Sequence, residues 1–409
     1  MKLLHTSDWH LGKRLGDFSR LPEQHKVLAE ICEIAETQNV DAIIVAGDIF
    51  DTFNPPVEAV ELFYKTVKRL SANGTKPVIV IAGNHDSPER IEAPDPLARE
   101  CGIIMTGNPF THVPRFKLQT GIEVFESKPG LTVIKLPQFN YYLRVLHTPY
   151  ANELRLKTNL GITNPDQSLR EVLSETWAQA LKTDSTEQMV TVLATHLYMV
   201  QADGPRPEEP IDEEKPIVLP GGLSEIFTNS IPQVVDYVAL GHLHRRHVIA
   251  SDPCPVVYSG SPLAYSFSEA FQDKYVEIID LEPGKIAIHQ PIKLTSGFRL
   301  VRKRFQTNDE AYEWLPQNPD CLIELTISTS NYLTPELVRH LNSLHAGIVT
   351  IIPEIIGDAH NQTSNTAMPD LSKDFIALFS DYFTSRKQAP PDEETLSILK
   401  EIMAWEDSE

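Results

Sequence analysis

The chain contains 409 residues, of which 41% are hydrophobic and 22% are charged, a balance typical of a globular protein with two or three domains. This composition excludes a wholly disordered chain, a fibre and a disulfide-dependent miniprotein. The formal net charge of −20 excludes binding to nucleic acid through bulk positive charge, so action on a polyanion would require metal ions, a local basic patch or a partner.

Neither a membrane segment nor a disulfide framework is predicted. No stretch approaches the ~18 consecutive apolar residues of a membrane helix, and the first residues lack the apolar region of a signal peptide. The four cysteines are scattered without CxxC spacing, which is typical of reduced thiols and not of a zinc site: Cys32, Cys101, Cys254 and Cys321. We therefore expect a cytoplasmic protein without membrane contact.

The first third of the chain alternates apolar strands with segments of helical period. Strands are predicted at 3–6, 41–46 and 78–82, and helices at 21–37 and 57–70. Because the strands are continuously apolar and helices separate them, we expect an α/β fold with a parallel sheet that is covered on both faces.

The middle of the chain is richer in strands. These are expected at 131–136, 190–194, 237–240, 256–258, 275–281 and 286–291, with a helix at 167–181. The proline-rich acidic segment 204–220 is predicted to be an exposed loop.

The pattern changes near residue 295. Strands at 298–301, 322–327 and 348–352 alternate with helices at 309–315 and 335–344, which predicts a compact α+β unit. A polar linker at 358–369 precedes two short apolar-faced helices at 371–386 and 393–405. The domain boundaries predicted from these shifts are 1–294, 295–357 and 358–409.

Polar clusters follow five of the predicted strands. They are Asp8-Trp9-His10, Gly47-Asp48-Ile49-Phe50-Asp51, Gly83-Asn84-His85-Asp86, Thr195-His196 and Gly241-His242-Leu243-His244. In open α/β sheets the ligand site lies beyond the carboxyl ends of the strands, so we expect these clusters to converge.

Asp, His and Asn without Cys form an oxygen and nitrogen donor set that suits Mn²⁺, Fe²⁺ or Zn²⁺. Each motif alone occurs often by chance, but the ordered set does not. It offers more donors than one ion can use, and one carboxylate can bridge two ions. Two-metal sites of this kind clamp the attacking and leaving oxygens of a phosphoryl displacement.

The motifs resemble those of the calcineurin-like metallophosphoesterases. HTSDWHLGKRL, DAIIVAGDIFDT, IAGNHDS, YVALGHLHR and YSGSPLAYSF are similar, more closely, to the SbcD family of bacterial nuclease subunits. The resemblance implies a two-sheet sandwich flanked by helices, with a smaller α+β capping domain that binds DNA and C-terminal helices that dock on a partner. Packing of these helices back onto this chain is the alternative.

Ligand roles follow from this resemblance. One metal would be held by Asp8, His10, Asp48 and His244, and the other by Asp48, Asn84, His196 and His242, with Asp48 bridging. The implied cofactors are two Mn²⁺ ions, with Mg²⁺, Fe²⁺ or Zn²⁺ as alternatives. No other cofactor is implied.

Catalytic roles fall on His85 and Asp51. His85 would stabilise the transition state or protonate the leaving oxygen, and Asp51 would orient and charge His85. Asp86 has two interpretations, a further catalytic carboxylate or a turn and capping residue, and the second is favoured.

Basic residues follow the ligand motifs directly: Lys13, Arg14, Arg245 and Arg246. Their position places them near the mouth of the site, where they would contact DNA phosphates. Solvated surface charge is the alternative for each. Arg302-Lys303-Arg304 is a weaker candidate, and Trp9 is either a base-stacking residue or, preferably, packing beneath the metals.

The resemblance implies a DNA nuclease subunit with 3′–5′ double-strand exonuclease activity and single-strand and hairpin endonuclease activity. It would act with an SbcC-like coiled-coil ATPase in end processing, repair and recombination, as a homodimer within a heterotetramer. ATP would bind the partner, since no P-loop is present. A small-molecule phosphodiesterase and a non-catalytic scaffold are the alternatives.

Overall fold

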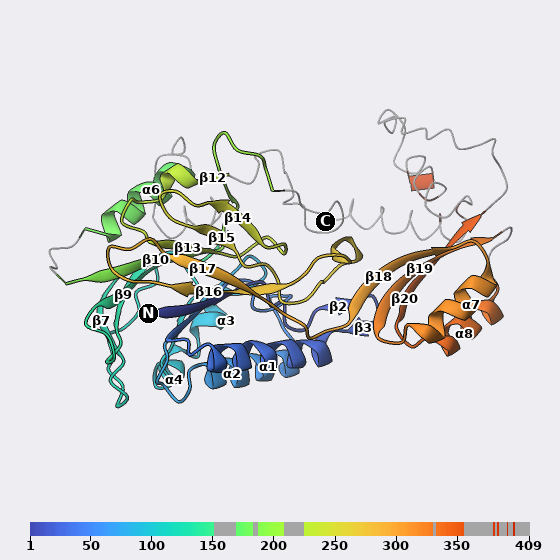
Figure 1. The fold of residues 1–409 in the computed structure, drawn as a ribbon, viewed down its shortest axis with the longest axis horizontal. Coiled ribbons are helices and arrows are strands. Elements are labelled where there is room, and N and C mark those ends of the chain that lie inside the picture. Colours follow the sequence, from blue (N-terminus) through green and yellow to red (C-terminus); the bar gives the residue numbers. More distant parts are fainter. Residues whose placement is uncertain are drawn as a thin grey trace. The chain divides into compact units, whose positions relative to one another are not determined.

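The computed structural model describes residues 1–150, 169–182, 187–207, 225–329 and 333–355, and the single residues 379, 380, 383, 391 and 396. Contacts divide the chain into two units, Met1–Ile355 and Ile356–Glu409. The predicted linker and both C-terminal helices fall almost wholly outside the described residues, as does most of the acidic segment. The labelled helices and strands all belong to the first unit (Figure 1).

The first sheet has the strand order β17-β16-β1-β4-β5-β6. Four strands are parallel: β1 (Lys2–Thr6), β4 (Ala42–Ala46), β5 (Val78–Ile81) and β6 (Ile103–Thr106). At one edge, β16 (Tyr275–Asp280) and β17 (Ile288–Lys293) run antiparallel. The connections between the parallel strands carry α1 (Leu21–Thr37), α2 (Val57–Leu70), α3 (Pro88–Glu92) and α4 (Asp95–Arg99).

The second sheet has the order β14-β15-β13-β10-β9-β8-β7. Its strands are β7 (Glu123–Lys128), β8 (Leu131–Lys135), β9 (Tyr142–Thr148), β10 (Met189–Thr195), β13 (Tyr237–Leu240), β14 (His247–Ala250) and β15 (Val256–Tyr258). Helix α6 (Leu169–Ala180) packs through Trp177 and Leu173 in a core cluster with strands of this sheet.

Alternating residues of the central strands pack into two separate hydrophobic cores, one on each face of the first sheet. Leu4, Ile43 and Val45 pack with helices α1 and α2, whereas Leu3 and Ile44 face the second sheet. The continuous apolar runs are therefore explained by burial on both faces, as expected, and the cover on one face is a sheet. The two-sheet sandwich implied by the sequence is confirmed.

A third, smaller sheet is built from the parallel strands β18 (Arg299–Phe305), β19 (Cys321–Thr329) and β20 (Ile348–Ile355). Helices α7 (Asn308–Gln317) and α8 (Pro335–Leu344) complete it, and Thr307 and Thr334 cap their N-termini. This layer has its own core, yet its Leu300 and Leu322 also pack with Leu15 and Phe267. The domain boundary at 294 stays a prediction, because contacts place residues 1–355 in one unit.

Short elements complete the described chain: the paired strands β2 (Arg14–Leu15) and β3 (Phe18–Ser19), the pair β11 (Met199–Val200) and β12 (Ile226–Phe227), and the 3₁₀ turns η1 (Thr228–Ser230) and η2 (Phe267–Glu269). Among the described residues, no helix combines the length and the apolar character that crossing a bilayer requires.

Candidate metal centre

The predicted polar clusters converge where the ends of both large sheets meet. Main-chain hydrogen bonds join the loops that follow β1 and β4, from Asp8 N–H to the Gly47 carbonyl (3.0 Å) and from His10 N–H to the Asp48 carbonyl (2.9 Å). The loop after β13 is joined to β10, from Gly241 N–H to the Thr195 carbonyl (3.1 Å). Segments far apart in sequence therefore meet at one place, as expected.

The backbone at this place adopts conformations that side chains disfavour. Asp8 (φ 52°), His10 (φ 42°), Asp48 (φ 48°) and His242 (φ 110°) all have positive φ. Such strain persists only where the surrounding structure enforces it, and it concentrates at functional sites. Close approach is also required at Gly83, where an added Cβ would lie 2.0 Å from Asp48 Oδ1.

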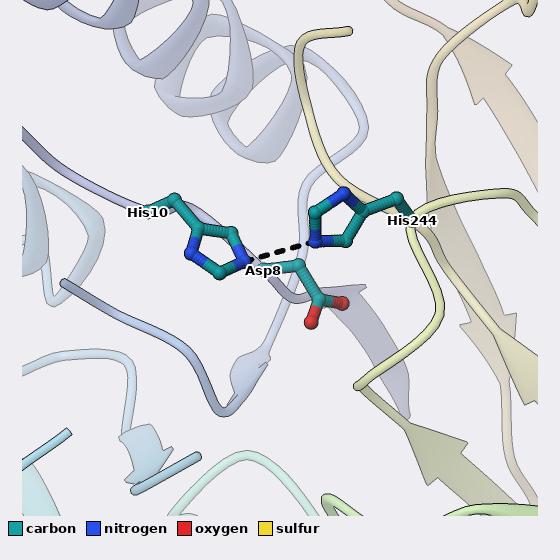
Figure 2. Close-up of side chains that lie close together, drawn as sticks. All are labelled: Asp8, His10 and His244. Atoms are coloured by element: carbon teal, nitrogen blue, oxygen red, sulfur yellow. Dashed lines mark hydrogen bonds between the residues drawn. The ribbon is translucent and has the colours of Figure 1, made fainter. Parts of the chain in front are cut away.

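One group of donors consists of Asp8, His10 and His244 (Figure 2). All three side chains are buried. The two ring nitrogens His10 Nε2 and His244 Nε2 face each other at 2.9 Å. Asp8 is held by hydrogen bonds from the Ser7 hydroxyl and, at 2.9 Å, from His242 N–H.

A second group lies around Asp48. Its Oδ2 is 3.3 Å from His196 Nε2 and 3.6 Å from His10 Nε2, so this carboxylate faces both groups. Asn84 Oδ1 is 3.0 Å from His196 Nε2 and 3.2 Å from His242 Nδ1. His196 Nδ1 lies 2.9 Å from the Ala46 carbonyl, to which it donates, so Nε2 is the nitrogen left facing the site.

The electrostatics of the cluster show how strongly its members interact. Burial raises the pKa of Asp8. Burial would also raise the pKa of Asp48, but the neighbouring His196 holds it well below the ordinary value. Burial lowers the pKa of His196, and Asp48 outweighs this to give a pKa of about 9. Opposed imidazoles and adjacent buried carboxylates require a proton or a cation between them, so the donor set fits divalent metal ions.

His85 is half-buried beside these donors. Its N–H donates to Asp48 Oδ1 (2.9 Å), and its ring lies 4.9 Å from that of His10. Its Nδ1 is 2.9 Å from the main-chain carbonyl of Asp51. The hydrogen-bond contact of His85 Nδ1 is thus with the backbone of Asp51. A carboxylate oxygen of Asp51 and ring nitrogens of His85 and His10 lie within 4.8 Å of one another, and the expected action of this carboxylate on His85 stays a prediction.

The Asp51 carboxylate faces other partners. Its Oδ1 lies 3.1 Å from Lys13 Nζ and 3.7 Å from His10 Nδ1. Burial opposes its ionisation, but His10 and Lys13 together hold its pKa below the ordinary value. Asp51 thus links a candidate metal ligand to a basic residue, a contact that no motif indicated.

Asp86 joins the loops that follow β4 and β5 through hydrogen bonds to their main chains. It is fully buried and accepts three main-chain hydrogen bonds, from Gly83 (2.8 Å), Phe50 (2.9 Å) and Ile49 (3.0 Å). This geometry supports the favoured interpretation of Asp86 as a turn carboxylate.

The basic residues differ in what they can offer to a ligand. Arg245 is exposed. Arg14 is also exposed, and its guanidinium donates a hydrogen bond to the main-chain carbonyl of Asp17. Arg246 is paired with the buried carboxylate of Glu277, and Lys13 with Asp51. Arg14 and Arg245 are therefore the more accessible of the four.

Trp9 is completely buried, and its Nε1–H donates to Thr6 Oγ1 at 3.0 Å. The favoured interpretation of Trp9 as a packing residue is confirmed, because a buried ring cannot stack on a base. In the third sheet, Arg302 pairs with Glu324 and Arg304 with Glu354, while Lys303 lies over the ring of Trp314.

Several residues around the ligands were not predicted. Gln24 Nε2 donates to the His10 carbonyl (2.8 Å) and lies 3.1 Å from the Tyr265 hydroxyl. Glu269 lies 3.3 Å from His244 Nδ1 and pairs with Lys274. Tyr265 lies within the motif YSGSPLAYSF, but no spacing rule marks Gln24, Glu269 or Lys274.

Buried carboxylates and imidazoles at the ends of two packed sheets are the hallmarks of a metallophosphoesterase. Residues 1–246 match the calcineurin-like phosphoesterase family. The chain belongs to this family and, within it, to the SbcD proteins of the SbcCD nucleases.

Three relatives are named as the SbcD component of the nuclease SbcCD. The protein of Bacillus subtilis (strain 168) is 35% identical over 416 residues, which cover 100% of this chain and 99% of that protein. The Rhodobacter capsulatus protein is 33% identical over 71% of this chain and 69% of its own length. The Escherichia coli (strain K12) protein is 29% identical, with 81% and 79% covered.

Proposed function

We propose that this chain hydrolyses DNA phosphodiesters with two bound divalent cations, as the nuclease component of a complex with an SbcC-like ATPase. The observation that carries the proposal is the position of Asp48, whose Oδ2 faces His196 and His10 together. A carboxylate between two groups of donors is what a two-metal phosphodiesterase needs.

The proposed ligands of one cation are Asp8, His10, Asp48 and His244, and those of the other are Asp48, Asn84, His196 and His242. The first set is supported by the compact donor group of Asp8, His10 and His244, although Asp8 also lies in a donor group with Asp48 and His196. In the second set, Asn84 Oδ1 lies between the rings of His196 and His242.

Divalent cations bound here would supply Lewis-acid activation of the phosphodiester and of a water nucleophile. Of the proposed ligands only two are carboxylates, Asp8 and Asp48, against four positive charges of two dications. The loaded site is therefore net positive, which attracts a phosphodiester to an acidic protein.

His85 is the proposed proton donor to the leaving oxygen. Its Nδ1 is engaged by the Asp51 carbonyl, so Nε2 is the nitrogen that would carry this proton. Asp51 is proposed to hold His85 through that carbonyl and to neutralise Lys13 through its carboxylate.

Mn²⁺ is the proposed metal, with Mg²⁺, Fe²⁺ or Zn²⁺ as alternatives that the donor set also accepts. The proposed DNA contacts are Lys13, Arg14, Arg245 and Arg246. The proposed activities are 3′–5′ exonuclease action on duplex ends and endonuclease action on single strands and hairpins.

The proposed assembly is a homodimer of this chain with two ATPase chains, in the cytoplasm and on the nucleoid. The names of the relatives describe one component of a larger nuclease, SbcCD. The C-terminal segment is proposed to dock on the ATPase.

The test uses the purified chain with Mn²⁺ and two substrates, a hairpin-ended DNA duplex and bis-p-nitrophenyl phosphate. His85→Ala is the catalytic variant, and His25→Ala, which removes an exposed imidazole, is its control. DNA cleavage that persists in His25→Ala and is lost in His85→Ala supports the proposal.

Two outcomes would contradict the nuclease proposal. Hydrolysis of the small ester with intact DNA, repeated with the ATPase present, would favour a small-molecule phosphodiesterase. Failure to bind Mn²⁺ would favour a non-catalytic scaffold.

A further inference from the structure

Glu269 is a buried carboxylate beside the candidate metal centre. It ends the turn η2, and it is 3% exposed. Its Oε1 lies 3.3 Å from His244 Nδ1 and 3.3 Å from the main-chain nitrogen of Tyr265. A carboxylate accepts both hydrogen bonds, so the His244 proton is placed on Nδ1.

Lys274 holds Glu269 in this position. Its ammonium pairs with Glu269 Oε2 and also donates to the His244 carbonyl (3.0 Å) and to Ser261 Oγ (3.0 Å). All three ammonium hydrogens are thereby used. Lys274 is itself 8% exposed, so the pair is shielded from solvent.

The consequence for His244 is a fixed tautomer. With the proton on Nδ1, the lone pair of Nε2 points away from Glu269, and Nε2 faces His10 Nε2 at 2.9 Å. Lys274 neutralises Glu269, so the carboxylate orients the imidazole without adding net negative charge to the site. In other metalloproteins, mutation of a carboxylate that is hydrogen-bonded to a metal-binding histidine typically lowers the metal affinity by about 10–100-fold.

The two other fully buried imidazoles among the proposed ligands, His196 and His10, have different Nδ1 partners. His196 Nδ1 lies against a main-chain carbonyl, that of Ala46. His10 Nδ1 has the Asp51 carboxylate at 3.7 Å, beyond hydrogen-bond distance. Of these three rings, His244 is the one whose Nδ1 is hydrogen-bonded to a buried, charge-compensated carboxylate.

We propose that Glu269 is a positioning residue that holds His244 as a metal ligand, with Lys274 fixing Glu269. This inference rests on the proposed function, because it requires His244 to bind a cation.

The test measures Mn²⁺ binding to the metal-free chain by calorimetry and by the electron paramagnetic resonance signal of free Mn²⁺. The variants are Glu269→Ala, Glu269→Gln, Lys274→Met and His244→Ala. The matched control is Glu277→Gln, which alters another buried glutamate, paired with Arg246 and His289. Urea unfolding of each variant reports stability separately.

Glu269→Ala is expected to weaken one of two Mn²⁺ sites by about 10–100-fold. Glu269→Gln, which can keep an oxygen on His244 Nδ1, is expected to weaken it less, while Glu277→Gln lowers stability without changing Mn²⁺ affinity. If Glu269→Ala does not fold, Lys274→Met must show the selective loss.

Two results would overturn the inference in distinguishable ways. Normal Mn²⁺ affinity in the Glu269 and Lys274 variants, with weakened binding in His244→Ala, would leave the ligand set intact and make Glu269 merely structural. Normal affinity in His244→Ala would remove the ligand set and the inference with it.

Discussion

Asp86 offers a quantitative test of how the site loops are held. In Asp86→Ala, the main-chain N–H groups of Ile49, Phe50 and Gly83 lose their acceptor. Each buried N–H left unsatisfied costs about 1–3 kcal/mol, so the three together cost about 6 kcal/mol.

Part of this cost is offset by the removal of a buried charge. Burial and the nearby Asp48 raise the pKa of Asp86 from 3.8 to about 6. At about 1.4 kcal/mol per pKa unit, the ionised carboxylate is disfavoured by about 3 kcal/mol. The net destabilisation expected for Asp86→Ala is therefore about 3 kcal/mol.

Asp86→Asn should behave differently. The amide oxygen can replace Oδ2, which accepts from both Ile49 and Gly83, and only the Phe50 N–H loses its acceptor. The loss of one bond, about 2 kcal/mol, and the removal of the charge nearly cancel. The free energy of unfolding should then stay within about 1 kcal/mol of the parent value.

The assay is urea unfolding at pH 7 with EDTA, which keeps the comparison free of bound metal. Asp17→Ala, which removes an exposed carboxylate, is the control and should change stability by less than about 0.5 kcal/mol. Equal stabilities of the Ala and Asn variants would refute the reasoning, because they would show that the three hydrogen bonds do not hold the loops.

Three further predictions concern the site and the core. Gly83→Ala should abolish Mn²⁺ binding, because its Cβ would lie 2.0 Å from Asp48 Oδ1; normal stoichiometry in calorimetry would contradict this. Mn²⁺ at 100 times its dissociation constant should raise the free energy of unfolding by about 2.7 kcal/mol for each occupied site over EDTA-treated protein, and an unchanged urea midpoint would argue against a native-state site. Burial lowers the pKa of His147 from 6.5 to about 4, so below pH 6.5 the unfolded chain takes up a proton that the folded chain refuses. The loss of stability between pH 7 and pH 5 should therefore be about 2 kcal/mol smaller in His147→Gln, and equal losses would show that His147 does not contribute.

Features set by local pattern could be predicted from the sequence. Helices α1, α2 and α8 begin and end at the predicted residues, because their apolar spacing and proline or polar boundaries are encoded locally. The convergence of the motifs proposed as metal ligands could be predicted because each follows an apolar strand, and parallel strands bring their carboxyl ends together.

Features set by long-range contact could not be predicted. Strand β9 has the sequence Tyr-Leu-Arg-Val-Leu-His-Thr, which the sequence pattern does not mark as a buried strand. Its polar side chains are hydrogen-bonded to residues of neighbouring strands: Arg144 donates to Thr191, and His147 is hydrogen-bonded to Thr132. The pairing of Arg246 with Glu277 joins different parts of the sandwich. No spacing in the sequence indicates such a contact.

The donors of the proposed metal centre come from both halves of the sandwich, and this has a consequence during synthesis. Loops of the first sheet contribute Asp8, Asp48 and Asn84, whereas His196, His242 and His244 follow strands of the second sheet. The first sheet is itself completed only by β16, which pairs with β1, and by β17, which pairs with β16. A nascent or truncated chain that ends before residue 242 therefore lacks donors for both proposed cations, and an unfinished product cannot cut DNA by this chemistry.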